Sequence, residues 1–272
     1  MSSRAESIVA PYLERWKLVR DGPAFTTPSS ALIPVVAWGR KAILKVATER
    51  EEELGSRLMV WWNGRGSAPV LEHDGPAIVL LRAEGTRSLT AMAEAGGDQD
   101  DEATRVLCAA ASTLHAVRGE PPEGLVGLDR WFCELFVHAE TRGGFFGRAA
   151  SVARMLINEK SEPVVLHGDV HHGNVLDFGD DGWRAIDPKH VRGDRAFDFA
   201  NILCNPDARV ALGPGRLERQ LAIICRQTGI AHERMTAWTV AWCGLSSAWS
   251  ERSGDGGRHA LQVGLAAERI LG

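Results

Sequence analysis

The sequence lacks the features that place a chain in a membrane or in an oxidising compartment. No apolar run approaches the ~18 residues that span a bilayer, and the N-terminus has no apolar signal-peptide core. The five cysteines never form a C-x-x-C pair, and four of them lie in helix-like apolar runs. We therefore expect buried, reduced thiols and a cytoplasmic protein.

Repetition and excess positive charge are also missing. No internal repeat and no low-complexity tail is present, and the net charge of -4 argues against non-specific binding of nucleic acid. With 272 residues, of which 44% are apolar and 24% charged, the chain has the composition of a globular protein. Its length fits one large domain or two lobes with a substantial core.

The residues that carry chemistry are concentrated between positions 164 and 188, which read VVLHGDVHHGNVLDFGDDGWRAIDP. A short apolar strand leads into a polar loop at 167–174. Two more short strands follow, joined by a polar turn at 179–182. The pattern predicts a strand, a polar loop and a hairpin that returns Asp187 towards the loop.

Three polar side chains in this stretch have the spacing of a kinase-type phosphoryl-transfer site. Asp169 lies five residues before Asn174, as in the D-x-x-x-x-N catalytic loop of kinases, and Asp187 follows at a strand end. In such loops the first Asp accepts the proton of the attacking hydroxyl group. The Asn and the second Asp hold Mg²⁺, a hard cation that prefers oxygen ligands. We therefore predict Asp169 as the catalytic residue, with Asn174 and Asp187 as metal ligands.

Two other interpretations of the stretch remain open. Its three histidines loosely suggest a zinc metallohydrolase, although the H-x-H-x-D-H order of that chemistry is absent. Asp169 and Asn174 on their own would be ordinary turn residues. The strand that ends at Asp187 argues against this second interpretation.

A lysine within an apolar strand is the second sign of a nucleotide site. Lys45 lies in AILKV, and its ammonium group needs a partner because an unpaired buried charge is costly. In kinases this lysine contacts the α- and β-phosphates and pairs with a helical Glu. The predicted helix at 49–63 opens with four acids, of which Glu52 is the preferred partner because it shares a face with small and apolar residues. Glu51 and Glu53 are the alternative partners. The alternative interpretation of Lys45 is a strand lysine whose ammonium group extends to solvent.

Together these motifs resemble a known family. HGDVHHGN followed by IDP is similar to the signature of the aminoglycoside phosphotransferases, which are related to protein kinases. IDPKHVRGDRAFDFANILCNP, WWNGRGSAPVLEHD and CGLSSAW resemble the streptomycin/hydroxyurea phosphotransferase branch. The resemblance covers roughly residues 28–249 and is strongest in the catalytic stretch. It implies an α+β, two-lobed protein-kinase-like fold, with a small antiparallel-sheet N-lobe and a larger, mainly helical C-lobe.

The resemblance also implies how the lobes share the site. The N-lobe, residues 1–82, would cover the nucleotide. The C-lobe, residues 83–272, would carry the catalytic loop, the metal site and the acceptor site. Backbone groups of Arg82 and Ala83, at the hinge between the lobes, would contact the adenine.

Kinases cover the nucleotide phosphates with a glycine-rich loop, but this sequence has no G-x-G-x-x-G at the corresponding point. TTPSS, residues 26–30, stands there instead. We expect the hydroxyl and backbone N–H groups of Ser29 and Ser30 to replace the glycine-rich loop. A solvent-exposed linker is the alternative.

Further residues are expected to support the loop or to bind the acceptor. His167 and His171 would brace the loop by hydrogen bonds, and the resemblance implies that Asp198 braces it through the backbone; a surface acid is the alternative for Asp198. Acids beside an aromatic wall would suit the two guanidinium groups of streptomycin through charge-assisted hydrogen bonds and cation–π contacts. Trp249 and Glu251 are the candidates, although an aromatic stripe on a helix is more often core.

Periodicity predicts the remaining elements. Alternating or continuous apolar residues predict strands at 32–38, 42–46, 68–72 and 77–81. Apolar residues at helical spacing predict helices at 4–20, 88–95, 98–117, 128–140, 145–159, 194–204, 217–229, 233–249 and 257–271.

The predicted reaction is transfer of the γ-phosphoryl group of ATP, with Mg²⁺, to a hydroxyl group of a small molecule. By resemblance, the acceptor is an aminoglycoside of the streptomycin type, modified at the 6-position, and the modification confers antibiotic resistance. A metabolic kinase for hydroxyurea, a sugar or a choline-type acceptor is the main alternative. A nucleotide-binding pseudoenzyme and a zinc metallohydrolase are further alternatives. We expect a monomer or weak dimer that binds neither nucleic acid nor membranes.

Overall fold

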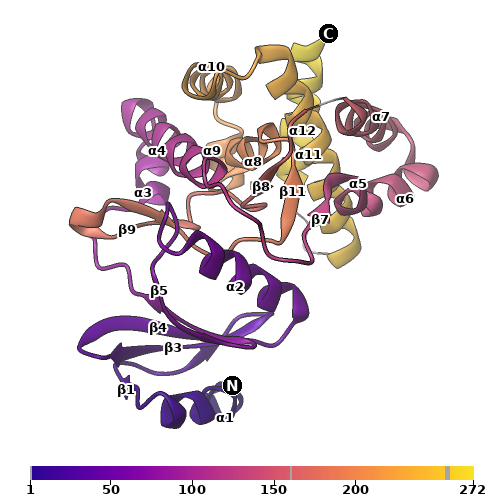
Figure 1. Cartoon of the computed structure of the whole chain (residues 1–272). Helices are drawn as coiled ribbons and strands as arrows, with labels where there is room; N and C mark the ends of the chain where they lie inside the picture. Colours follow the sequence, from indigo (N-terminus) through magenta and orange to yellow (C-terminus); the bar gives the residue numbers. More distant parts are fainter. Residues whose placement is uncertain (1, 160, 255–257) are drawn as a thin grey trace.

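The structure is a computed structural model that describes residues 2–159, 161–254 and 258–272. Figure 1 shows a twisted sheet flanked by two helices at the N-terminal end and a larger helical part that holds the C-terminus. The predicted α+β fold, with a small antiparallel sheet and a mainly helical remainder, is confirmed. Within the described ranges, none of the helices combines the length and the apolar character needed to cross a bilayer.

One antiparallel sheet organises the N-terminal part. Its strand order is β1-β3-β4-β6-β5, and β2 pairs with β3. The long hairpin of β3 and β4 turns at Trp38 and Gly39, which both have positive φ angles. The bounds are β1 (Val19–Arg20), β2 (Phe25–Thr26), β3 (Ser30–Ala37), β4 (Arg40–Ala47), β5 (Val70–Asp74) and β6 (Ala77–Leu81).

The two faces of this sheet carry different residues because side chains alternate along a strand. On β4, Leu44 and Val46 are buried in a cluster with residues of α1 (Ser2–Arg15), whereas Lys45 lines a cleft on the other side. In Figure 1, α1 lies on the outer face of the sheet and α2 (Arg50–Trp62) lies between the sheet and the helical part. The same apolar strand therefore buries one face in a core and presents Lys45 to the cleft.

The helix predicted at 4–20 is wrong at its C-terminal end. α1 ends at Arg15, and Val19 lies in β1, where it pairs with Val36. Lys17 has a φ angle of 53° and leaves the helical conformation. After Arg15, Trp16 lies in a turn and Val19 in an edge strand, which helical spacing alone does not distinguish from a longer helix.

The helical part contains ten α-helices among the described residues. The helix predicted at 128–140 is divided in two at Phe132, and the one predicted at 194–204 is α8 followed by a 3-10 helix at Asn201–Cys204. The bounds are α3 (Leu89–Ala95), α4 (Gly97–His115), α5 (Leu128–Trp131), α6 (Cys133–Arg142), α7 (Gly144–Asn158), α8 (Ala196–Ala200), α9 (Ala208–Ala211), α10 (Arg216–Thr228), α11 (His232–Ser253) and α12 (Arg258–Leu271).

Short strands in the helical part frame the polar loop. The predicted hairpin is present as β9 (Val175–Asp177) and β10 (Trp183–Ala185). The strand before the loop, β8 (Val164–Leu166), pairs antiparallel with β11 (Val191–Gly193), which pairs parallel with β7 (Val126–Gly127). The sequence did not predict β7 or β11, because each contains only one apolar residue, a valine, whereas β8, β9 and β10 contain two or three.

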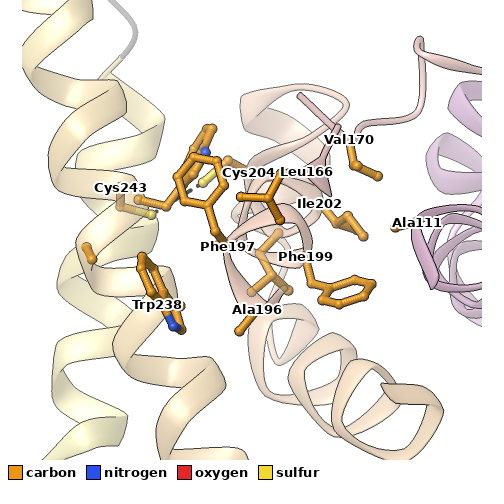
Figure 2. Packing of buried hydrophobic residues seen from close by; sticks show 14 of the residues in the cluster. Ala111, Leu166, Val170, Ala196, Phe197, Phe199, Ile202, Cys204, Trp238 and Cys243 are labelled. Carbon is orange, nitrogen blue, oxygen red and sulfur yellow. Dashed lines mark hydrogen bonds between the residues drawn. The ribbon is translucent and has the colours of Figure 1, made fainter. Parts of the chain in front are cut away.

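A continuous apolar core holds α8 against α4 and α11. Figure 2 shows Phe197, Phe199 and Ile202 between Ala111 of α4 on one side and Trp238 and Cys243 of α11 on the other. All of these side chains are almost fully buried. Because α8 is apolar around most of its surface, it is fixed on every side, and so is the residue that follows it, Asn201.

The cysteines are free thiols, as expected, but they are not all buried. Cys108, Cys204 and Cys243 are buried, and the sulfur atoms of the last two lie 3.4 Å apart. Cys133 is exposed, contrary to the expectation, because it begins α6 at the surface.

The connection between the two parts of the chain is fixed by Asp177. The Gly85 N–H donates to the Asp177 carbonyl at 2.9 Å, and Arg87 Nε and Nη2 donate to the carboxylate at 2.9 and 2.8 Å. The Arg87 guanidinium group holds the pKa of the Asp177 carboxyl well below its usual range. Since β6 ends at Leu81 and the first following helix begins at Leu89, we propose that the lobes divide near residue 83.

Candidate active site

A cavity of about 510 Å³ lies between the sheet, α2 and the β9-β10 hairpin. Its walls are largely apolar, with Leu32, Ile43 and Met59 among them. The structure brings most of the predicted nucleotide and metal residues to this one cavity: Ser29, Lys45, Glu52, Arg82, Ala83, Asn174 and Asp187. A concave, mainly apolar site with a few convergent polar groups is the usual form of a small-ligand site.

Lys45 is paired on both sides. Its Nζ donates to Glu52 Oε2 at 2.5 Å and also contacts Asp187 Oδ1. Of the three candidate acids on α2, Glu52 is therefore the partner. Its side chain is only 7% exposed, so both charges require the pairing. Burial alone would raise the pKa of the Asp187 carboxyl, but Lys45 outweighs it and holds that pKa below its ordinary value.

Glu52 also pairs with a lysine that the sequence did not single out. Lys189 Nζ donates to Glu52 Oε1 at 3.1 Å, so one carboxylate lies between two ammonium groups. Burial lowers the pKa of the Lys189 ammonium group, but Glu52 outweighs it and leaves that pKa above its ordinary value. An isolated lysine after a strand end has no sequence pattern that would have revealed this contact.

Asp187 has an uncommon backbone conformation that its neighbours enforce. Its φ angle is 60°, in the left-handed region that costs most residues of order 1–3 kcal/mol. The Ile186 N–H donates to the Asn174 carbonyl at 2.9 Å, and the Ile186 carbonyl accepts from His167 Nε2 at 2.8 Å. The Lys189 N–H donates to the His167 carbonyl at 2.6 Å. These bonds on both sides of Asp187 fix its side chain at the cleft beside Asn174.

The carboxylate of Asp169 is oriented by two asparagines. Its Oδ1 accepts from Asn201 Nδ2 at 2.8 Å, and its Oδ2 accepts from Asn174 Nδ2 at 3.3 Å. The Asn174 amide also donates to the Asp169 carbonyl at 3.0 Å. Asn205 Nδ2 in turn donates to Asn201 Oδ1 at 2.8 Å. The sequence did not predict Asn201, because it lies in an apolar run that reads as core helix.

Asp198 contacts the backbone of the polar loop, as the resemblance implies. Its carboxylate accepts from the backbone N–H groups of His167 and Gly168 at 2.8 and 2.7 Å, and it lies 2.7 Å from His115 Nε2. Burial alone would raise the pKa of the Asp198 carboxyl, but the hydrogen bond with His115 and the neighbouring groups outweigh it and leave that pKa lowered. No pattern in the sequence indicated His115, which is the last residue of α4.

The histidines of the loop form hydrogen bonds within the loop and with its neighbours. His167 Nδ1 accepts from the Asp169 N–H at 3.2 Å while its Nε2 donates to Ile186, so the ring is neutral. Burial also lowers the pKa of His167. His171 Nδ1 accepts from the Gly173 N–H at 3.0 Å. Among the residues described, no three His, Cys, Asp or Glu side chains converge as a metal-binding group, and the zinc hypothesis therefore has no geometric support.

A second cavity, of about 690 Å³, lies beside Asp169 and faces α11. His171, Asn201 and the predicted Trp249 line it, together with Trp131, whose ring meets that of Trp249 edge-on at 5.8 Å. Three acids line it, Glu51, Glu134 and Asp169. Three bases line it as well, Arg130, Lys189 and Arg252, and Arg252 pairs with Glu134 at 3.4 Å. This cavity therefore combines carboxylates with an aromatic wall.

Glu251 lies outside this cavity, contrary to the prediction. Its carboxylate accepts from Arg142 Nη2 at 2.7 Å and lies 3.0 Å from His138 Nε2, at a separate hollow. Trp249 and Glu251 are two residues apart on α11, and so their side chains point about 200° apart around the helix. Only one of the two can face Asp169.

One further prediction for the nucleotide cavity needs correction, that for Ser30. Ser30 is 1% exposed and lines a different cavity with Ile8 and Thr48, since it alternates with Ser29 across the sheet. Arg82 lines the nucleotide cavity, as does Ala83; the Arg82 side chain pairs with Asp21 at 2.6 Å, and the Arg82 backbone N–H donates to the Lys41 carbonyl at 3.1 Å. Contact of the Arg82 and Ala83 backbone with adenine stays a prediction.

Gly55 allows α2 to approach the segment after Asp187. A Cβ atom at this position would lie 2.3 Å from the Pro188 carbonyl oxygen. We expect Gly55→Ala to push α2 away and to lower the free energy of unfolding by about 1–3 kcal/mol in urea denaturation. The matched control is Gly147→Ala in α7, where nothing lies within 4 Å of the added Cβ, and which should be neutral or slightly stabilising. Equal stability of the two variants would contradict this account.

Comparison with solved structures identifies the class. An aminoglycoside phosphotransferase, APH(4)-Ia, solved as a ternary complex with ADP and hygromycin B, is similar over 97% of this chain and 98% of its own, with a TM-score of 0.68 and 16% identity. A choline kinase from Streptococcus pneumoniae is similar over 99% of both chains, with a TM-score of 0.66 and 14% identity. The fold is that of the protein-kinase-like phosphotransferases.

Sequence comparison identifies the family within this class. The model of the aminoglycoside/hydroxyurea antibiotic resistance kinase family matches residues 15–254, and the chain belongs to that family. A streptomycin 3''-kinase from Klebsiella pneumoniae is 46% identical over 268 residues, which are 95% of this chain and 100% of that protein. A hydroxyurea phosphotransferase from Kitasatospora aureofaciens is 32% identical, over 97% of this chain and 78% of that protein. A streptomycin 6-kinase from Streptomyces griseus is 31% identical, over 91% and 83%. The predicted family is confirmed, and the protein is a phosphotransferase.

Proposed function

We propose that this phosphotransferase uses ATP to phosphorylate a hydroxyl group of streptomycin. One observation carries the proposal: Asp169 lines the cavity with the aromatic wall while its carboxylate is hydrogen-bonded to Asn174, which lines the other cavity. A carboxylate at this junction is where an acceptor hydroxyl would meet a nucleotide phosphate. The kinase relatives named for streptomycin support the choice of acceptor.

In the proposed reaction, the acceptor hydroxyl donates a hydrogen bond to Asp169. The hydroxyl oxygen forms a bond to the γ-phosphorus as the bond between that phosphorus and the β–γ bridging oxygen breaks. ADP leaves with the electron pair of the broken bond, and the hydroxyl proton passes to Asp169 and then to solvent. Such transfer depends mainly on positioning and electrostatic stabilisation, which the bonds from Asn201 and Asn174 provide for Asp169.

Asn174 and Asp187 fit a magnesium-binding role. The Asn174 amide nitrogen donates to Asp169, so its amide oxygen is the atom left for a cation in the cleft. Asp187 supplies a carboxylate in the same cavity. Mg²⁺ commonly binds through one or two protein oxygens and the phosphates, and when bound it would neutralise charge on the phosphate groups. Lys45, held by Glu52, would contact the α- and β-phosphates.

The size and the aromatic wall of the second cavity favour a large acceptor with cationic groups. Streptomycin carries two guanidinium groups, which suit the Glu51 carboxylate and the rings of Trp131 and Trp249. Hydroxyurea is the second candidate, because one relative is named for it. A cavity of about 690 Å³ is far larger than hydroxyurea requires, and streptomycin is therefore the better match.

A comparison with the streptomycin 3''-kinase and the streptomycin 6-kinase supports a choice of the hydroxyl that is modified. The motifs alone led us to expect the 6-position. The 3''-kinase, however, is 46% identical over its whole length, against 31% for the 6-kinase. We propose the 3''-hydroxyl as the site of phosphorylation, with the 6-hydroxyl as the alternative.

The test is a coupled assay of ADP release from the purified protein with ATP and Mg²⁺, using streptomycin, hydroxyurea, choline and hygromycin B as acceptors. We expect release only with streptomycin, with one ADP formed per phosphorylated product. Phosphorus–proton correlation in the NMR spectrum of the product distinguishes the two hydroxyl groups. Absence of phosphorylated streptomycin, or faster turnover with hydroxyurea, would overturn the proposed acceptor.

A further inference from the structure

Lys189 lies where the two cavities meet. Among the residues that the structure describes, it is the one that lines both the nucleotide cleft and the cavity beside Asp169. Its side chain is 22% exposed, so the ammonium group is accessible from the cavities but shielded from bulk solvent. Because transfer moves a phosphoryl group from one cavity to the other, a cation at their boundary lies on that path.

Both ends of this lysine are held in place. The Lys189 N–H donates to the His167 carbonyl at 2.6 Å, which ties its backbone to the loop that carries Asp169. A Cβ on Gly168 would lie 2.8 Å from Lys189 Cβ, so the two segments are in direct contact. At the other end, Nζ donates to Glu52 Oε1 at 3.1 Å. The ammonium position is therefore set by the catalytic loop and by α2 together.

The ammonium groups of Lys189 and Lys45 have different contacts, which indicates different roles. Lys45 contacts both Glu52 and Asp187, deep in the nucleotide cleft, whereas Lys189 contacts Glu52 alone and reaches the side of Asp169. The loop between Asp169 and Asn174 reads VHHG and contains no lysine or arginine. The cations beside Asp169 come from outside this loop: Arg130, Lys189 and Arg252 line the same cavity, and of these three only Lys189 also lines the nucleotide cleft.

We propose that the Lys189 ammonium group binds the γ-phosphoryl group of the nucleotide at the boundary of the two cavities, and that Glu52 positions it there. This inference rests on the proposed function and adds to it a residue that distinguishes a nucleoside triphosphate from a diphosphate. Charge-assisted hydrogen bonds to a phosphoryl group strengthen as charge develops in transfer, so the contact serves both binding and turnover.

The test compares the dissociation constants of AMP-PNP and ADP, each with Mg²⁺, by calorimetry on Lys189→Met and on the unaltered protein. We expect AMP-PNP to bind roughly tenfold more weakly to the variant, because one hydrogen bond between charged groups is lost. ADP, which lacks the γ-phosphoryl group, should bind within twofold of the unaltered protein. The variant's kcat with streptomycin should fall on the order of 10²-fold.

Two controls make the result specific. Lys41→Met removes a lysine of β4 that lines neither cavity and pairs at the surface with Glu84, and it should change none of these values. Lys189→Arg, which keeps the charge, should retain most of the preference for AMP-PNP over ADP. If Lys189→Met does not fold, Lys189→Gln serves in its place.

An equal loss of affinity for both nucleotides would mean that Lys189 only supports Glu52, and would overturn the inference. Unchanged affinity for AMP-PNP would overturn it as well. Because the binding measurement needs no acceptor, its outcome is separate from that of the proposed function. Failure to phosphorylate streptomycin would remove the proposed acceptor while the nucleotide comparison still decides the role of Lys189.

Discussion

Asp169→Asn should reduce kcat for phosphoryl transfer on the order of 10³-fold, because the amide cannot accept the hydroxyl proton. The dissociation constant of ADP should change less than threefold, since the Asp169 side chain lines the acceptor cavity and not the nucleotide cleft. Steady-state kinetics with streptomycin and calorimetry with ADP measure the two quantities. The amide is close in size to the carboxylate and retains one oxygen for the bond from Asn201.

Two further variants serve as comparisons for Asp169→Asn. Asp181→Asn changes an exposed acid on the β9-β10 hairpin and should leave kcat unchanged. Asn201→Ala, which removes the donor to Asp169 at 2.8 Å, should lower kcat less than Asp169→Asn does, because the carboxylate is still present but less well oriented. An Asp169→Asn variant with more than a tenth of the original kcat would exclude Asp169 as the proton acceptor.

Of the substitutions proposed for this protein, Asp198→Asn should lower the free energy of unfolding most. The carboxylate is almost fully buried and binds His115 and two backbone N–H groups, so replacing it leaves a buried network partly unsatisfied. We expect the free energy of unfolding to fall by about 3 kcal/mol at pH 7, measured by urea denaturation. Asp180→Asn, at an exposed position of the hairpin, is the control and should have little effect.

The difference in the free energy of unfolding between the original protein and Asp198→Asn should become smaller in acid. The pKa of the Asp198 carboxyl is lowered in the folded protein, so at low pH the unfolded chain binds a proton at this residue more readily than the folded chain does. The Asp198 carboxylate therefore contributes its full stabilisation at pH values above its unfolded pKa of about 3.9. The contribution is lost as the pH falls through the folded pKa. The difference between the original protein and Asp198→Asn should therefore be equal at pH 7 and pH 5 and shrink only below about pH 4. A difference that grows on acidification would contradict the assignment.

Much of the candidate site was predictable because its signals are local. The D-x-x-x-x-N spacing, the strand end at Asp187 and the charged residue in an apolar strand each lie within a short stretch of sequence. Lys45 and Glu52 are only seven residues apart, so a strand followed by a helix is sufficient to bring them together. Local patterns thus predicted which residues gather at the cleft.

The residues that were missed are brought together by the tertiary fold. His115 comes from the end of α4, 83 positions before Asp198, and no periodicity connects the two. Asn201 is one polar residue within an otherwise apolar run, which reads as core. The incorrect assignments have a different cause: Ser30 and Glu251 lie next to the site in sequence but on the wrong side of a strand or helix. Most helices and the longer strands were predictable from the sequence, but the orientation of the Ser30 and Glu251 side chains was not.

Glu51 and Glu52 are consecutive residues at the start of α2, yet each lines a different cavity. Their side chains leave the helix about 100° apart, so a small rigid-body rotation of α2 alters the two cavities at the same moment. Substitutions that tilt this helix should consequently change the Michaelis constants for nucleotide and acceptor in a correlated way.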